Sequence, residues 1–365
     1  MSKDNHTRIV VKVGSNVLTR TDGTLDVTRM SALVDQVAEL RRDGTEVILV
    51  SSGAVAAGRS EVHPSGRLDS VASRQLFSAV GQAKLINRYY ELFREHGIAV
   101  GQVLTTKESF GTRQHYLNQR ACMEVMLRNG VLPIVNENDT ISVTELMFTD
   151  NDELSGLIAT MMDASALFIL SNIDGVYTGP PSEPDSVLLR DIRPGEDLSE
   201  YIRQEKSGFG RGGMITKTRI ARKVAEEGIA VWIADGKRER ILPDLMAHPD
   251  TTPCTRFVPS PVAPSSVKKW IAHSDDFCKG EIQLDEEATR RLTEGQVASI
   301  LPVGITRVEG DFEEDDLIRI IGADGQRVGV GKADCDATTL RRELGCKDKK
   351  PVVHYDFLYV ESSVC

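Results

Sequence analysis

Short apolar runs alternate with amphipathic segments along the first 235 residues of the chain. Residues 8–13 form a β-branched run that would be apolar on both sides of a strand. Residues 30–44 instead place Leu33, Val37 and Leu40 on one face of a helix. Strands of this kind, alternating with helices, predict an α/β fold with a doubly wound, mainly parallel sheet sandwiched by helices.

The same alternation predicts an ordered series of elements. We expect strands at residues 8–13, 46–50, 98–104, 131–135, 166–170 and 229–234, and helices at residues 30–44, 75–97, 117–130, 153–163 and 214–228.

The pattern changes beyond Pro243. Residues 249–266 contain five prolines, which predicts a rigid surface connection, and a short helix is expected at 267–274. From about Cys278 the expected strands are shorter, and a D-G turn signal at 323–327 predicts a hairpin. We therefore expect one domain at 1–260, a linker at 261–277 and a small, mainly β domain at 278–365. Its expected strands are 280–284, 297–301, 304–310, 316–322, 327–333 and 351–360.

Composition limits the partners of this 365-residue chain. The net charge of −10 disfavours binding to nucleic acid or to anionic membranes, and residues 276–365 carry 12 Lys and Arg against 19 Asp and Glu, a net of −7. Without a run of about 18 uncharged apolar residues or a signal-peptide pattern, we expect a cytoplasmic protein. The six cysteines show no metal-ligand spacing and are expected to be reduced.

Candidate site residues follow the expected strands, because ligands of open α/β sheets bind beyond the carboxyl ends of the strands. Lys12 interrupts an apolar strand; it either reaches solvent at the strand end or points a cation into the crevice. Ser52 and Gly53 follow the next strand, and their backbone N–H groups either receive an anion or cap a helix. Asp139 is a turn residue or a ligand contact.

The segment GFGRGGMITK at 208–217 is glycine-rich but is not a P-loop, since Lys217 comes four residues after Gly213. If a helix begins near Met214, Lys217 projects beside its start, and backbone N–H groups of the glycines could approach an anion such as a triphosphate. The alternative is a flexible surface loop. Asp152 either stabilises the start of its own helix or orients two lysines, and Asn151 either caps that helix or contacts substrate.

The array VVKVGSNVL, ILVSSGAVAAG, AVGQAKL, PIVNENDTIS, DNDELSGLIA, NIDGVYT and GFGRGGMITK occurs in this order over residues 8–217. It resembles the amino acid kinase family, and within it the glutamate 5-kinases; residues 278–365 look like the PUA domain appended to many bacterial members. The resemblance implies ATP-dependent phosphorylation of the γ-carboxylate of L-glutamate to L-glutamyl 5-phosphate, the first step of proline biosynthesis, with Mg²⁺. It further implies a homo-oligomer, dimer or tetramer, and feedback inhibition by proline.

The resemblance also implies a role for each matching position, with no metal ligand among them. Many relatives have Asp where this chain has Asn172, which leaves that nucleotide contact open. The implied catalytic residues are Lys12, Lys217 and Asp152, the substrate-binding residues are Ser52, Gly53, Asp139 and Asn151, and the nucleotide-binding residues are Lys12, Ser171, Asn172, Arg211, Gly212, Gly213, Met214, Ile215, Thr216 and Lys217.

Two alternatives stay open. A relative with another acceptor would phosphorylate aspartate, N-acetylglutamate, carbamate, a nucleoside monophosphate or isopentenyl phosphate. Asp139 with Asn151 favours a free amino acid, because a carboxylate pairs with an ammonium group and repels phosphate. An RNA-binding protein with a PUA domain is disfavoured by the net charge of −7 in residues 276–365.

Overall fold

The computed structural model describes residues 7–111, 113–141, 150–196, 198, 213–261, 271, 278–294, 298–347 and 349–360. It divides into two compact units. One is drawn from residues 1–109 and 117–263, and the other from residues 110–116 and 264–365. The domain boundaries expected from the sequence stay predictions. No helix among the described residues has the length and apolar composition needed to span a membrane.

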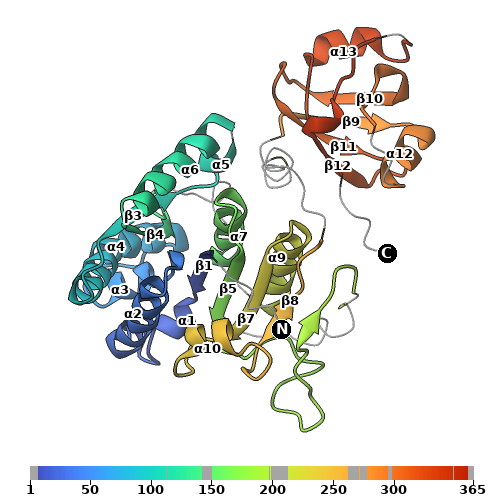
Figure 1. The fold of residues 1–365 in the computed structure, drawn as a ribbon. Helices are drawn as coiled ribbons and strands as arrows, with labels where there is room; N and C mark the ends of the chain where they lie inside the picture. The colour runs from blue at the N-terminus through green and yellow to red at the C-terminus, as the bar shows by residue number, and fades with distance from the viewer. Residues whose placement is uncertain are drawn as a thin grey trace. The chain divides into compact units, whose positions relative to one another are not determined.

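Among the described residues, the first unit contains an eight-stranded sheet in the order β3-β4-β2-β1-β5-β7-β8-β6 (Figure 1). Neighbouring strands are parallel except β7 and β8, which are antiparallel. The expected α/β fold with a mainly parallel sheet is therefore confirmed. The strands are β1 (Arg8–Val13), β2 (Glu46–Ser51), β3 (Val100–Thr105), β4 (Leu132–Glu137), β5 (Ala166–Ser171), β6 (Asp191–Ile192), β7 (Ala230–Asp235) and β8 (Thr255–Phe257).

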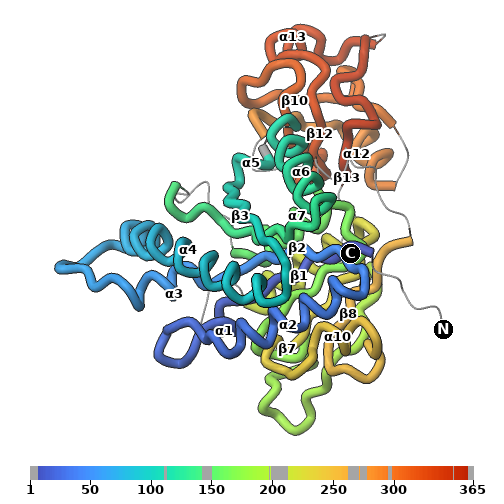
Figure 2. The backbone as a smooth tube through the Cα atoms, turned by 60° about the vertical axis from the view of Figure 1, so that its left-hand side comes forward, coloured from blue at the N-terminus to red at the C-terminus, as the bar shows by residue number. Residues whose placement is uncertain are grey.

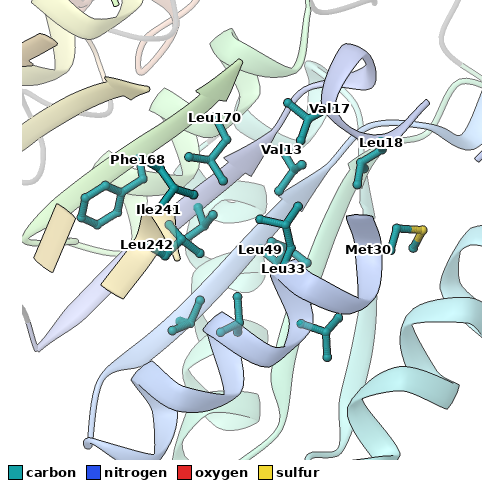
Figure 3. Close-up of a cluster of buried hydrophobic side chains, with 14 of the residues drawn as sticks. Val13, Val17, Leu18, Met30, Leu33, Leu49, Phe168, Leu170, Ile241 and Leu242 are labelled. Carbon is teal, nitrogen blue, oxygen red and sulfur yellow. The ribbon is translucent and has the colours of Figure 1, made fainter. Parts of the chain in front are cut away.

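Helices cover both faces of this sheet. On one face, apolar side chains of α1, α2 and α10 pack with those of the central strands (Figure 3), and residues of α4 belong to the same buried cluster. Helices α7 and α9 lie side by side over the other face (Figure 1). The helices are α1 (Ser15–Leu18), α2 (Val27–Arg42), α3 (Ala54–Arg59), α4 (Ser70–Glu95), α5 (Glu108–Gly111), α6 (Arg113–Arg128), α7 (Asn151–Met161), α9 (Met214–Glu226) and α10 (Ile241–Ala247).

Helices α3 and α4 pack closely against each other (Figure 2), and α3 begins three residues after the end of β2. A Cβ atom on Gly81 would lie 1.8 Å from the backbone oxygen of Ala54, and one on Gly58 would lie 1.9 Å from that of Phe77. Only glycine permits this backbone contact. The two glycines therefore hold α4 against α3, the helix that follows β2.

The second unit contains, among its described residues, a five-stranded sheet in the order β10-β9-β11-β12-β13. Its core includes Ile282, Ile318 and Ile320. The expected hairpin joins β11 and β12, with Gly325 at a φ of 78°. The elements are β9 (Gly280–Leu284), α12 (Glu286–Thr293), β10 (Ile305–Gly310), β11 (Leu317–Ile321), β12 (Arg327–Lys332), α13 (Ala337–Glu343) and β13 (Leu358–Val360).

Two strands expected in this unit are wrong. Among the described residues 298–301, Ile300 alone makes an isolated bridge, to Val353, and Pro302 then starts a 3-10 helix. Residues 351–360 contribute the bridge at Val353 and the short strand β13, since Tyr355–Phe357 form a 3-10 turn. Proline lacks the N–H group that a longer ladder needs. The helix expected at 267–274 lies outside the described residues, apart from the single position 271.

Candidate active site

A pocket of about 300 Å³ lies at the carboxyl ends of the central strands β1, β2, β4 and β5. This is where an open α/β sheet is expected to bind a ligand. Its lining is Lys12, Gly14, Ser15, Asn16, Ser52, Gly53, Ala54, Val55, Ala56, Arg74, Asn136, Glu137, Asp139, Asp150, Asn151, Asp152, Ser171 and Lys217.

Two buried lysines meet one carboxylate in this pocket. In β1, Val11 and Val13 join the apolar cluster, so Lys12 points to the opposite face of the sheet, toward α7. Its Nζ contacts Asp152 Oδ1, and Lys217 Nζ lies 2.9 Å from Asp152 Oδ2. The two lysines are 5% and 7% exposed and Asp152 is fully buried. We call Lys12, Lys217 and Asp152 the lysine clamp.

The two lysines of the lysine clamp keep its carboxylate ionised. Burial alone would raise the pKa of Asp152, but the positive charges of Lys12 and Lys217 and their hydrogen bonds outweigh burial and lower it below its ordinary value. Asp152 therefore stays ionised at neutral pH. By formal count, the lysine clamp carries a net charge of +1, which suits the binding of an anion.

Helix α9 presents Lys217 within its first turn. The helix begins at Met214 after Gly213, which has extended backbone and makes no side-chain cap. The backbone N–H of Lys217 donates to the oxygen of Gly213 at 3.2 Å. Ile215 is 55% exposed. Of the other predicted nucleotide positions in this segment, Arg211 and Gly212 lie outside the described residues.

Asp150 caps α7 next to the lysine clamp. Its Oδ1 accepts from the backbone N–H groups of Asp152 and Glu153, at 2.8 and 3.2 Å. Its Oδ2 is buried and has no hydrogen-bond partner among the described residues. Burial and the nearby charge of Asp152 raise the pKa of Asp150 to about 6. Its proton equilibrium therefore falls close to neutral pH.

A second charged group in the pocket pairs one cation with two carboxylates, the reverse of the lysine clamp. The side chain of Arg74, on α4, donates from Nε to Asp139 Oδ1 at 2.6 Å and from Nη2 to Glu137 Oε2 at 2.7 Å. Ser78 Oγ donates to Asp139 Oδ2 at 2.9 Å. Glu137 and Asp139 are only 3% and 7% exposed. We call Arg74, Glu137 and Asp139 the arginine corner; its formal charge is −1.

Neutral side chains connect these two groups. Asn151 Nδ2 donates to Ser52 Oγ at 2.9 Å and to Asn136 Oδ1 at 3.0 Å. Asn136 Nδ2 in turn donates to Gln82 Oε1 on α4 at 2.8 Å. The amide of Asn151, adjacent in sequence to Asp152, therefore ties the start of α7 to the ends of β2 and β4.

The structure brings most of the sequence-predicted residues into this pocket. Besides the lysine clamp, it is lined by the predicted substrate positions Ser52, Gly53, Asp139 and Asn151 and by Ser171. Gly53 has a φ of 107°, a conformation that glycine adopts freely.

The remaining predicted nucleotide positions are placed elsewhere. Asn172 is exposed, with its Oδ1 3.5 Å from Ser171 Oγ. Neither Asn172 nor the described segment Gly213, Met214, Ile215 and Thr216 contributes to the lining of this pocket. Their predicted contacts with a nucleotide stay predictions.

Sequence reasoning missed the part of the site that α4 supplies. Arg74, Ser78 and Gln82 lie four residues apart, so they share one face of the helix. All three bond to side chains that follow or end β4. Polar residues at this spacing, in a helix whose other face is apolar, are the signal that could have identified them.

Comparisons with known proteins are consistent over the whole chain. The model of the Amino acid kinase family matches residues 7–235, and that of the PUA domain matches residues 280–355. The chain is 70% identical to glutamate 5-kinase of Bacteroides thetaiotaomicron, over 98% of this chain and all of that protein. It is 50% identical to glutamate 5-kinase of Chlorobaculum tepidum, over 97% of each. A solved T. acidophilum isopentenyl phosphate kinase aligns with a TM-score of 0.49 at 15% identity, covering 69% of this chain and all of that one.

Proposed function

Since this chain belongs to the amino acid kinase family, and within it to the glutamate 5-kinases, we propose that the pocket binds L-glutamate between the lysine clamp and the arginine corner and phosphorylates its γ-carboxylate with ATP. The observation that carries this proposal is the pair of buried lysines on Asp152 in the same pocket as Asp139. Lys12 and Lys217 face the phosphoryl group, and Asp139 faces the ammonium group.

The two charged groups match the two ends of the acceptor. The lysine clamp, with a formal charge of +1, favours the phosphoryl group and the γ-carboxylate. The arginine corner, with a formal charge of −1, favours the α-ammonium group. A phosphorylated or acylated acceptor has no free ammonium for Asp139. The arrangement therefore supports a free amino acid as the acceptor.

The reaction needs no strong base, because a carboxylate is already ionised at neutral pH. An oxygen of the γ-carboxylate attacks the γ-phosphorus of ATP, the bond to the bridging oxygen breaks, and ADP leaves with that electron pair. Lys12 and Lys217 offset the negative charge that spreads over the transferring group, and Asp152 keeps both lysines in place. Positioning and charge compensation are the two contributions that the chain makes.

Mg²⁺ and the nucleotide belong to this proposal. Mg²⁺ neutralises phosphate oxygens when it is bound with ATP, and at such sites it takes oxygen ligands and retains water. Asp150 Oδ2, a buried carboxylate oxygen without a hydrogen-bond partner among the described residues, offers that chemistry in the pocket. Ser171 lies in the lining and Gly213 precedes α9, positions that support phosphate binding beside Lys217.

The test is a screen of acceptors with ATP and Mg²⁺, in which hydroxylamine traps the acyl phosphate as a hydroxamate. We expect product with L-glutamate, and little with aspartate, N-acetylglutamate or carbamate. Glutarate, which lacks the amino group, separates binding of the ammonium from binding of the carboxylates. Absence of hydroxamate with glutamate would contradict the proposal. Inhibition by proline and the homo-oligomeric state stay predictions that kinetics with added proline and light scattering would test.

A further inference from the structure

We propose that Arg74 is a positioning residue for the acceptor amino acid and that it acts through Asp139. Its guanidinium pairs with Glu137 and Asp139 and orients them, so that Asp139 presents its carboxylate to the ammonium group of the substrate. This inference rests on the function proposed above and adds a residue to it.

The geometry of Asp139 leaves room for this role. The carboxylate is only 7% exposed and receives Arg74 Nε on Oδ1 and Ser78 Oγ on Oδ2. A carboxylate offers about four acceptor positions. The hydrogen bonds from α4 therefore fix the plane of the carboxylate while Asp139 still lines the pocket, where an ammonium group can approach.

Charge explains why the guanidinium is needed. Glu137 and Asp139 are both nearly buried and share one guanidinium. Two buried carboxylates without a cation repel each other and lose hydration. The guanidinium offsets both costs and keeps the Asp139 carboxylate in place beside the pocket. The other charged side chains in the pocket lining are Lys12 of β1, Lys217 of α9, and Asp150 and Asp152 at the start of α7.

Helix α4 makes Arg74 a rigid support. Ser78 and Gln82 follow Arg74 on the same face and bond to Asp139 and Asn136. Gly81 packs against the backbone of α3 in the same stretch. The side chains that orient the acceptor site therefore come from a helix of 26 residues rather than from a loop.

The experiment compares Arg74→Gln and Arg74→Lys with the wild type in steady-state kinetics. We expect Arg74→Gln to raise KM for glutamate about 10- to 100-fold, as for a lost charged hydrogen bond, with kcat and KM for ATP within about threefold of wild type. Arg74→Lys should recover part of the loss. Arg88→Gln is the matched control, since Arg88 lies on the same helix in an ion pair with Glu91 at the surface.

Two readouts separate positioning from a merely structural role. In Arg74→Gln, the loss should appear in KM for glutamate and not in KM for ATP. The low turnover of glutarate, which has no ammonium group, should be the same in the variant and the wild type.

Three results would overturn the inference. The first is an unchanged KM for glutamate, and the second is a rise in KM for ATP equal to that for glutamate. The third is a loss of turnover with glutarate as large as that with glutamate, which would place the guanidinium on a substrate carboxylate. A wild-type enzyme inactive on glutamate would reject the proposed function first and this inference with it. If Arg74→Gln fails to fold, Arg74→Lys carries the test, with an expected rise in KM for glutamate of about 3- to 10-fold.

Discussion

The lysine clamp and the arginine corner are opposite solutions to the same problem. In the lysine clamp one fully buried carboxylate, Asp152, is shared by two ammonium groups. In the arginine corner one guanidinium, that of Arg74, is shared by two nearly buried carboxylates. Each group leaves one formal charge uncompensated, positive in the first and negative in the second.

The difference explains how one pocket can hold a zwitterion by both ends. Burying isolated charges is costly, and partners reduce that cost. An uneven ratio of partners keeps one charge available for a ligand while every charged side chain has a counter-ion. The neutral amides of Asn151 and Asn136 join the two groups without altering either charge. We infer that the ratio of cations to carboxylates sets the polarity of the site.

Asp152→Asn breaks the lysine clamp at its shared member and should have the largest effect. Two buried ammonium groups would lose their counter-charge, and removal of one partner from a buried ion pair costs about 3 to 5 kcal/mol of unfolding free energy. Urea unfolding at pH 7 measures this cost. Because the pKa of Asp152 is lowered in the folded protein, its stabilisation is present above the ordinary carboxyl pKa and is lost as the pH falls below it.

The matched control for Asp152→Asn is Glu39→Gln, which removes an exposed ion pair to Arg240. Exposed pairs contribute about 0 to 1 kcal/mol. Equal losses in the two variants would show that burial gives the lysine clamp no special role in stability.

Lys217→Met removes one cation from the lysine clamp and leaves Asp152 paired with Lys12. The formal charge of the group falls from +1 to zero, so the transferring phosphoryl group loses one counter-charge. By analogy with a lost oxyanion donor, we expect kcat to fall about 10²- to 10³-fold, with the fold retained. Single-turnover kinetics and a thermal melt measure the two quantities. Arg219→Ala, at an exposed position of the same helix, should leave both unchanged, and near-wild-type turnover of Lys217→Met would remove Lys217 from the mechanism.

Much of the sheet could be predicted because buried parallel strands leave a simple pattern. The run RIVVKV predicts β1 at residues 8–13, as found. The helix expected from residue 75 begins instead at Ser70, because the side chain of Asp69 accepts from Ala72 N–H and caps it. The strands of the second unit were harder to predict, because turns, bridges and 3-10 segments there contain the same apolar residues as strands.

The residues of the site likewise fall into those that the sequence predicts and those that it does not. Lys12 was predictable because it interrupts a strand at the edge where ligands bind, and Asp152 was predictable because it lies in the first turn of a helix. Arg74 was not, because its partners lie 63 and 65 residues further along the chain and no local pattern records that contact. The role of a side chain that supports another across elements depends on packing, which a single sequence does not state.

Of the three variants, Asp150→Asn should have the smallest effect. Asp150 is a carboxylate beside the lysine clamp, and its pKa is raised to about 6. The folded state holds a proton that the unfolded chain, with an ordinary pKa of 3.8, has already released. The wild type therefore loses stability as the pH rises from about 4 through 6. Asparagine caps helices as well as aspartate does, so the variant keeps the cap without the charge.

We expect Asp150→Asn to be more stable than the wild type above pH 6, by on the order of 3 kcal/mol, since each unit of pKa shift corresponds to about 1.4 kcal/mol. The gain should disappear below about pH 3, where the wild-type carboxyl is protonated in both states. Urea unfolding across this range measures it, and Asp69→Asn, at the exposed cap of α4, is the control with a matched hydrogen bond. A gain in stability that does not change with pH would show that its cause is not the ionisation of Asp150.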